Sequence, residues 1–423
     1  MNKDRGLPSL DVLVTGADER QGLAVIRALG SQGLKVCAAG LHKRNLGSLS
    51  RYTKAYHQYP PPLTDKQKFS EAILEAVKAY NIPVVIPVVE STVIALDEYR
   101  KIFAPHTLLA IPPSDSLEYA LDKKKTYELA ESLGITIPRT CSPVSVSEAT
   151  DFVKQTGFPI ILKPRAIGSY SRVAGAFDFK IRYIKDSASF EKAMIEFEQH
   201  GSFPMLQEYC PGVGVPQSTL CAKGKIIGIY QHRRGRDYPL TGGVASVVVS
   251  EKIDPQLLNW TEKLLGAMQW DGIAQVEYRV DQKTGKKVLF EINGRIWAPV
   301  SAAIKWGLNY PYALYEYIKD GVDTPMPDSY PLERRTRYLR GDLIALEGHL
   351  LGWTRDSVVP LPGKGRILWE ILKDFRPGVQ SDVGSWTDPT PSIYEYITLI
   401  LRYSYRSVYH LLRIPYRMIK RKR

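Results

Sequence analysis

The chain has few cysteines, no apolar leader pattern at its start and no long apolar run. Its four cysteines, Cys37, Cys141, Cys210 and Cys221, show no CxxC spacing, which argues against a zinc site and against a disulfide framework. The start of the chain lacks the apolar core of a signal peptide. No stretch of about 18 uncharged apolar residues occurs, so we expect no transmembrane helix. These absences predict a cytoplasmic protein.

The bulk composition is that of a globular protein with excess positive charge. Hydrophobic residues make up 44% and charged residues 24% of the 423 positions. This length suits about two to four domains. The net charge of +13 is compatible with nucleic acid, anionic small molecules or an anionic membrane as a partner. Much of the charge lies at the C-terminus, so its location is more informative than its size.

Residues 1–112 have the pattern of a parallel α/β domain. Strand patterns at 11–16, 35–39 and 84–89 alternate with helical patterns. The loop that begins at Gly16 is not GxGxxG, so a nicotinamide site is only weakly indicated. Glu90 begins a predicted loop at a strand's carboxyl end, where open α/β sheets bind ligands.

The rest of the chain divides into three parts. Residues 113–325 mix helix and strand patterns, which predicts an α+β domain with a small lobe at about 160–210. Proline-rich boundaries then delimit a C-terminal extension at 326–390. A basic amphipathic tail occupies 391–423.

Residues 275–295 predict a hairpin that collects metal ligands. Side-chain alternation places Glu291 and Asn293 on one side of the second strand, and pairing places Glu277 roughly opposite Glu291. Two carboxylates and an amide oxygen suit Mg²⁺, which completes its shell with phosphate oxygens and water. Arg295 is close enough in sequence to reach the same phosphates. The alternative is a hairpin with ordinary solvated charges.

An upstream lysine and loop suit nucleotide phosphates. Lys163 ends the hydrophobic strand pattern FPIILK, where its charge can reach phosphate groups, although a lysine at an exposed strand end has the same appearance. The loop from Arg165 to Arg172 is rich in small and basic residues. Its backbone N–H groups could cover phosphates, and a plain surface hairpin is the alternative.

These features, in this order, resemble the ATP-grasp superfamily over about residues 11–325. The matching pieces are LDKKKTYELAESLGITIP, ILKP, the loop at 165–175, LQEYCPG, and VEY followed by FEINGR. They are similar to carboxylate–amine ligases and to the ATP-grasp part of the carbamoyl-phosphate synthase large chain. The resemblance implies a parallel α/β domain in front, a small nucleotide-clamping lobe and a larger lobe with the metal hairpin.

The resemblance also implies residue roles. Lys123 and Lys163 match lysines at the nucleotide phosphates, and Arg295 matches the arginine that stabilises the transferred phosphate. The remaining matches are Gly168, Ser169 and Ser171 to the phosphate loop, Glu208 and Tyr209 to the adenine segment, and Glu277, Glu291 and Asn293 to the Mg²⁺ ligands, with Mn²⁺ as an alternative ion. The segment Pro211–Gly214 lacks the acidic residue that many relatives carry there, which leaves the ribose contacts open.

The implied reaction is ATP-dependent ligation of small molecules. ATP phosphorylates a carboxylate, an amine or a thiol attacks the acylphosphate, and ADP and phosphate are released. Two other classes stay open: a non-catalytic ATP-binding or scaffold protein of the same fold, and an NAD(P)-dependent reductase built on the front domain. The intact acidic residues argue against the first class, and the missing GxGxxG argues against the second.

A basic segment further on is the best candidate for binding the acyl substrate. Residues 231–236 read QHRRGR and precede a glycine pair. We expect this loop to hold the substrate carboxylate or the acylphosphate, with a solvated hairpin as the alternative. The candidate substrate residues are Glu90, His232, Arg233, Arg234, Arg236, Gly242 and Gly243.

The tail has a basic stripe. Residues 393–423 contain eight Arg or Lys and one Glu, and a helix would align Arg402, Arg406, His410, Arg413, Arg417 and Lys420 opposite an apolar side. This pattern favours peripheral attachment to an anionic membrane at its inner face. A helix docked on its own domain is the main alternative. The arginine and aromatic content also allows nucleic acid, but we expect no nucleic-acid partner.

Overall fold

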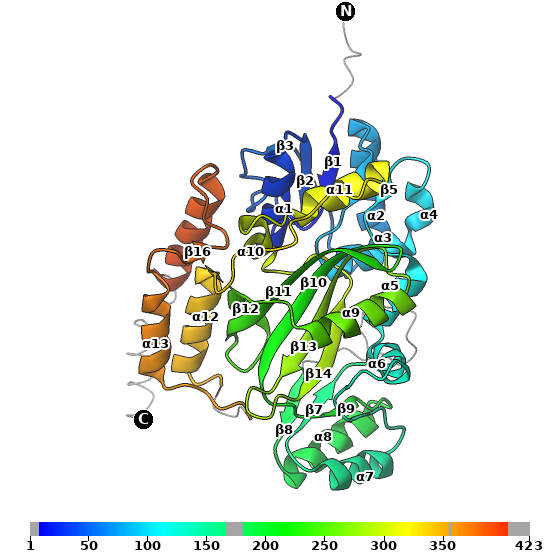
Figure 1. Ribbon diagram of the computed structural model, residues 1–423, viewed down its shortest axis with the longest axis vertical. Coiled ribbons are helices and arrows are strands. Elements are labelled where there is room, and N and C mark those ends of the chain that lie inside the picture. Colours follow the sequence, from blue (N-terminus) through cyan, green and yellow to red (C-terminus); the bar gives the residue numbers. More distant parts are fainter. Residues whose placement is uncertain (1–7, 166–180, 355–357, 405–423) are drawn as a thin grey trace, which may run out of the picture.

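The computed structural model describes residues 8–165, 181–354 and 358–404. These residues form a parallel sheet and two largely antiparallel sheets, each with its own helices (Figure 1). The mixed α/β and α+β fold class expected from the sequence is confirmed.

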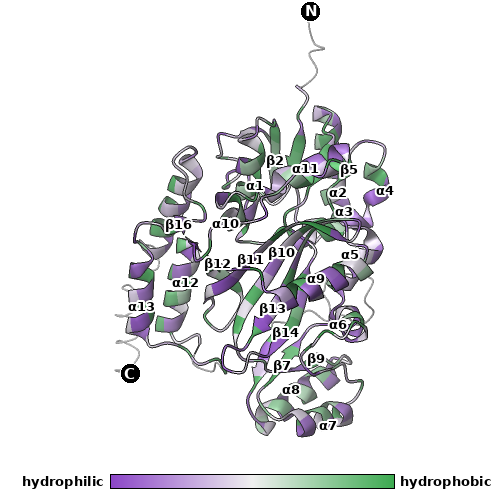
Figure 2. Ribbon diagram, in the orientation of Figure 1, coloured by the Kyte–Doolittle hydropathy of each residue, from purple (hydrophilic) through white to green (hydrophobic). Residues whose placement is uncertain are grey.

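The front sheet contains five parallel strands in the order β3-β2-β1-β4-β5. The strands are β1 (Val12–Val14), β2 (Val36–Gly40), β3 (Thr53–Gln58), β4 (Val84–Ile86) and β5 (Leu108–Leu109). The helices that follow them are α1 (Arg20–Gly30), α2 (Lys66–Tyr80), α3 (Glu90–Glu98) and α4 (Arg100–Phe103). Figure 2 shows the inner strands as hydrophobic, as expected for a parallel sheet that helices cover on both faces.

The two faces of this sheet are covered by different parts of the chain. Leu13 of β1 packs in one core cluster with Phe69 of α2. Val12 and Val14 pack in another cluster with α1 and with two helices from much later in the sequence, α10 (Val300–Lys305) and α11 (Tyr310–Asp320). The front domain is therefore completed by residues beyond 300.

The small lobe is a four-stranded antiparallel sheet in the order β6-β9-β7-β8. Its strands are β6 (Thr140–Cys141), β7 (Ile160–Lys163), β8 (Arg182–Ile184) and β9 (Met205–Glu208). The helices α7 (Val146–Thr156) and α8 (Ser187–Gln199) pack on it at the bottom of Figure 1. The connector before the lobe consists of α5 (Ser114–Leu121) and α6 (Lys123–Ser132).

The large sheet has seven strands in the order β14-β13-β10-β11-β12-β15-β16. Its long strands are β10 (Val213–Ala222), β11 (Lys225–Tyr238), β12 (Val244–Ser250), β13 (Gly272–Val280) and β14 (Lys287–Asn293). The helix α9 (Pro255–Ala267) buries Leu257 and Leu264 against it. The short strands β15 (Arg335–Arg337) and β16 (Gln380–Ser381) extend the far edge, so the C-terminal extension is part of this sheet.

The helices of the extension, α12 (Leu339–Leu350) and α13 (Lys364–Lys373), lie beside β11 and β12 on the left of Figure 1. Buried ion pairs hold them there. Arg236 of β11 contacts Asp342 of α12 at 2.7 Å and Asp374, just after α13, at 2.8 Å.

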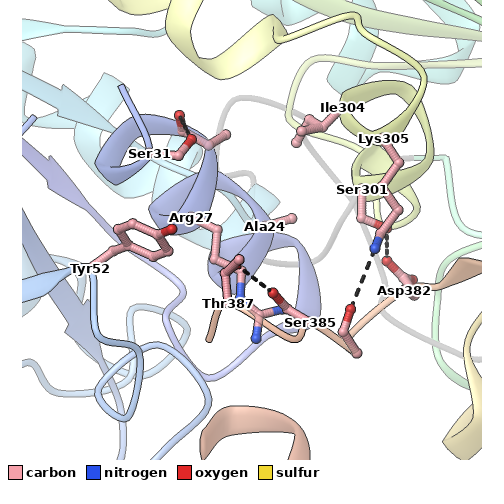
Figure 3. A pocket seen from close by; sticks show the side chains of 12 residues that line it. Ala24, Arg27, Ser31, Tyr52, Ser301, Ile304, Lys305, Asp382, Ser385 and Thr387 are labelled. Atoms are coloured by element: carbon pink, nitrogen blue, oxygen red, sulfur yellow. Dashed lines mark hydrogen bonds between the residues drawn. The ribbon is translucent and has the colours of Figure 1, made fainter. Parts of the chain in front are cut away.

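The end of the extension also contacts the front domain. Arg27 of α1 donates hydrogen bonds to Asp388 (2.9 Å) and to the carbonyl of Val383 (2.6 Å). Arg20 of α1 pairs with Asp382. Figure 3 shows Arg27, Asp382 and α10 around a cavity of about 190 Å³ between these elements. The C-terminal extension thus links the front domain to the large sheet.

The described part of the tail, a helix over residues 390–404, packs on its own chain. Glu395 and Leu399 are buried, and Arg402 contacts Glu347 of α12 at 3.4 Å. The other side of this helix leaves Ile393, Ile397, Ile400 and Leu401 exposed. Residues 405–423, with the rest of the basic stripe, lie outside the described residues. Nowhere in the described ranges is there a helix with the length and apolar character needed to cross a bilayer.

Candidate active site

The hairpin of β13 and β14 has the register that the sequence predicts. Glu277 lies opposite Glu291, and Gln275 lies opposite Asn293. The side-chain amide of Asn293 donates to a Glu277 oxygen at 3.2 Å, and Arg295 donates to the Asn293 oxygen at 3.2 Å. The alternating strand pattern and the polar turn thus bring these side chains together at one place.

Arg234 of β11 reaches Glu277 by crossing the intervening strand β10. Its guanidinium donates to both Glu277 oxygens, at 2.8 and 2.6 Å. The arginine stem passes directly over Gly214, where an added Cβ would lie only 2.8 Å from Arg234 Cδ. A glycine inside a strand commonly marks such a close approach. Gly214 is therefore a residue of the site that sequence reasoning missed.

Lys163 is buried at the end of β7. Its side chain is 2% exposed, and its Nζ has no hydrogen-bond partner among the described residues. The ammonium lies 3.7 Å from the ring centroid of Phe290, another residue that the sequence reading did not identify. Burial lowers the pKa of Lys163 to about 7, although the nearby Glu291 raises it. An unpaired buried amine of this kind is costly unless an anion binds beside it.

Most of these side chains line one cleft of about 340 Å³ where the small lobe meets the large sheet, and Asn293 and Arg295 lie behind its lining residues, in contact with Glu277 and with each other. The cleft brings together seven residues expected at the site, namely Lys123, Lys163, Arg234, Gly242, Gly243, Glu277 and Glu291. Lys123 is the first residue of α6. The Gly243 carbonyl accepts a hydrogen bond from Arg234 at 2.7 Å, so the glycine pair helps to hold that arginine.

The site is strongly charged. Burial tends to raise the pKa of Glu291, but Lys123 and Lys163, with two arginines, hold it below its usual range. Burial raises the pKa of Glu90, while Arg295 and Lys123 lower it. Glu90 therefore faces the site from the front domain. It lies in the first turn of α3 rather than in the loop that the sequence reading expects.

The basic segment 231–236 is part of strand β11, so the expectation that it forms a loop is wrong. His232 is buried in the sheet, where it stacks on Tyr230 and burial lowers its pKa to about 3. Arg233 pairs with two glutamates outside the cleft. The register shifts between Arg234 and Arg236, and Arg236 turns to α12 and α13. Only Arg234 of this segment lines the cleft.

Of the residues assigned to adenine and to the phosphate loop, the structure describes only Glu208 and Tyr209. The Glu208 carboxylate pairs with Arg139 at 2.9 Å and with Lys286 at 3.4 Å, and Glu208 is not among the residues that line the cleft. Tyr209 packs edge-on against Tyr183, which does line the cleft. Gly168, Ser169 and Ser171 lie outside the described residues.

The sequence of the chain is only weakly similar to those of known proteins. No protein-family model matches the chain. The large chain of carbamoyl phosphate synthase from Methanosarcina barkeri is 24% identical over 198 residues, which are 45% of this chain and 18% of that protein. The corresponding protein of Archaeoglobus fulgidus is 27% identical over 190 residues, 43% of this chain and 17% of that protein. The chain thus spans under a fifth of the length of these curated relatives.

Structural similarity is much broader. Biotin carboxylase from Campylobacter jejuni has a TM-score of 0.61 at 16% identity, covering 77% of this chain and 74% of that one. N5-carboxyaminoimidazole synthetase from Staphylococcus aureus has a TM-score of 0.60 at 14% identity, covering 82% and 87%.

These solved structures are ATP-grasp enzymes, so the chain has the ATP-grasp fold, as the sequence motifs indicated. Its sequence is similar to the large chain of carbamoyl phosphate synthase over less than half of its own length.

Proposed function

We propose that this protein is an ATP-dependent ligase that activates a carboxylate as an acylphosphate and joins it to an amine. The observation that carries the proposal is the buried, unpartnered ammonium of Lys163, which shares one cleft with the carboxylates of Glu277 and Glu291. A cation for phosphate and hard oxygen donors for a phosphate-bound ion are what Mg²⁺-ATP requires.

The donor set fits Mg²⁺ or Mn²⁺. Glu277, Glu291 and Asn293 would hold the ion, and Lys123 and Lys163 would contact the nucleotide phosphates. No group of three or more His, Cys, Asp or Glu side chains suited to a metal occurs among the described residues. Mg²⁺ usually takes one or two carboxylates and completes its shell with phosphate oxygens and water. When bound, the ion would neutralise phosphate charge.

The chain's own residues would do the rest by positioning and by charge. The substrate carboxylate oxygen attacks the γ-phosphorus, the bond to the β-phosphate oxygen breaks, and ADP leaves. Arg295, which Asn293 orients, would stabilise the charge on the transferred phosphoryl group. An amine then forms a C–N bond to the acyl carbon, and phosphate departs with the electrons of the C–O bond. Of the two protons that an ammonium acceptor loses, one stays on phosphate and one goes to solvent.

The acyl substrate would bind beside Arg234, Gly242 and Gly243, with Glu90 facing it from the front domain. Support comes from the position of Arg234, which lines the cleft and contacts Glu277. When the ion is bound, Glu277 would contact it, and Arg234 would then be available to the substrate carboxylate. His232, Arg233 and Arg236 have no part in this proposal, because the fold uses them elsewhere.

The deciding experiment incubates purified protein with ATP, Mg²⁺ and pooled carboxylates and amines, and follows ADP by mass spectrometry. Glu291→Gln should abolish ADP formation while circular dichroism stays unchanged. Glu262→Gln, which changes an exposed glutamate of α9, is the matched control and should behave as wild type. ATP binding without turnover in wild type would favour a scaffold protein. Turnover of NAD(P)H would favour a reductase.

A second proposal concerns location. We infer that residues 393–423 attach this otherwise cytoplasmic protein peripherally to an anionic membrane. The observation in favour is the exposed row of Ile393, Ile397, Ile400 and Leu401 on the described part of the tail.

A further inference from the structure

A further cavity, of about 580 Å³, opens where three parts of the chain meet. The front domain contributes the loops after β1 and β2, the large sheet contributes the end of β11, and the extension contributes α12 and the helix over 390–404. None of the candidate active-site residues lines it.

Two arginines of this cavity keep their hydrogen-bond donors unused. Arg44 and Arg340 both line it, and neither guanidinium forms a hydrogen bond or an ion pair with any residue that the structure describes. Arg340 is half-buried at the start of α12. Arg340 lies close enough to Glu19 and Glu395 to lower the pKa of both carboxyl groups, but its guanidinium makes no direct ion pair with either. Its N–H donors can therefore bind an anionic group on a ligand, because guanidinium binds carboxylate in a bidentate manner.

The cavity also contains an unsatisfied acid. Glu395 is 2% exposed, yet it lines the cavity, and its Oε1 has no hydrogen-bond partner among the described residues. Burial raises the pKa of Glu395 to about 7, while a hydrogen bond from Tyr338 lowers it. A buried carboxyl with a free oxygen is costly unless a donor fills the site, and an ammonium group is the donor that would keep it ionised.

The cavity lies near the proposed active site, because Tyr238 lines the cavity and the next residue, Pro239, lines the cleft. In the front sheet β1 lies between β2 and β4, and the order of strands reverses between β1 and β4. Open α/β sheets bind ligands outside the carboxyl ends of strands at such a reversal. Asp18 and Glu19, in the loop after β1, line the cavity, while Glu90 follows β4 and faces Arg295 and Lys123. Adjacent strands are about 4.8 Å apart, so these two loops are neighbours.

We propose that this cavity binds the amine acceptor, and that the acceptor belongs to the class of amino acids. Its carboxylate would lie on Arg340 and Arg44, and its ammonium group would lie on Glu395. This inference rests on the proposed ligase function, because it supplies the nucleophile for the acylphosphate formed in the neighbouring cleft.

The first test measures binding without ATP. Each of the proteinogenic L-α-amino acids is titrated singly into the full-length protein by calorimetry. Every amino acid that binds is then compared with its decarboxylated amine and with its N-acetyl derivative. We expect at least one amino acid to bind and both derivatives to bind at least about tenfold more weakly, since each lacks one charged contact. Failure of every amino acid to bind would overturn the inference.

The variants locate the site. Arg340→Gln and Glu395→Gln should each weaken binding of that amino acid about tenfold or more. Arg366→Gln removes an exposed arginine of α13 and should leave binding as in wild type. If Glu395→Gln proves unstable by thermal melting, Arg340→Gln and the exposed Arg44→Gln carry the test. Unchanged affinity in both arginine variants would overturn the assignment.

Chemical trapping of the acylphosphate distinguishes failure of the ligase function from failure of the acceptor site. Hydroxylamine, a small nucleophile that needs no binding site, should convert the acylphosphate into a hydroxamate in wild-type protein given ATP, Mg²⁺ and pooled carboxylates. Absence of hydroxamate counts against the ligase function itself. Hydroxamate formation together with no amino-acid binding counts against the acceptor site alone.

Discussion

Nucleotide binding should add a proton to Lys163. In the free protein burial lowers the pKa of this lysine to about 7, so near pH 8 roughly nine-tenths of the molecules carry the neutral amine. Phosphates placed beside the amine favour the ammonium form and raise the pKa again. Binding near pH 8 is therefore expected to take up about 0.9 proton per ATP.

The same linkage fixes the pH dependence of affinity. Below about pH 7 the lysine is charged in both states and contributes no slope. Above that value binding must first protonate the amine, so the Kd for ATP should rise roughly tenfold per pH unit until the pKa of the complex is reached. Affinity is thus lost as the pH rises.

Calorimetry in buffers of different ionisation enthalpy measures the proton uptake directly. Lys163→Met keeps the apolar stem and removes the charge. This variant should abolish both the proton uptake and the pH dependence of the Kd for ATP. Near pH 7 it should weaken ATP binding about 10- to 100-fold, because a charged contact of roughly 1.5–3 kcal/mol is lost. The nucleotide-free variant should melt no lower than wild type, because a buried amine without a partner is removed. Equal proton uptake in wild type and variant would show that Lys163 does not contact the phosphates.

Three further predictions follow from the structure. The nucleotide product should be ADP, because an acylphosphate forms by transfer of the γ-phosphoryl group; stoichiometric AMP and pyrophosphate would exclude this chemistry. Arg236→Met removes the arginine that Asp342 and Asp374 share, while Asp374 keeps Arg335 at 3.0 Å and Asp342 keeps Arg337 at 4.0 Å. It should lower the free energy of unfolding by about 1.5–3 kcal/mol in urea titrations; a loss near zero would mean that these pairs contribute nothing net. The full chain should co-sediment with anionic vesicles at low salt. A chain ending at residue 404 keeps the docked helix and should bind much less, because each lost basic residue is worth about 1 kcal/mol. Equal sedimentation of both chains would refute attachment through the tail.

The register of the β13–β14 hairpin was predictable because its information is local. Alternation along two adjacent strands and a polar turn between them determine that Glu277 faces Glu291, and the structure has that register. Lys163 was predictable as the end of an apolar strand, although its burial and the lack of a partner depend on how the lobes meet.

The basic segment was not predictable from local pattern. A run of charged residues usually marks an exposed turn, but here the strand continues to Tyr238. The aspartates that pair with Arg236 are Asp342 and Asp374, more than a hundred residues away. His232 is buried by neighbours that only the completed sheet supplies. Gly214 carried the one available signal, since a glycine within a strand pattern suggests that another group passes over it.

The contacts between α1 and the end of the extension have a consequence for biosynthesis. Arg20 and Arg27 find their carboxylate partners, Asp382 and Asp388, about 360 positions later in the chain. On the ribosome the front domain emerges first, but its two α1 arginines stay unpaired and one face of its sheet stays uncovered until α10, α11 and the extension have been translated. The earliest domain to be synthesised is therefore the last to be completed, and a nascent chain that stalls within the large sheet would expose hydrophobic surface to chaperones.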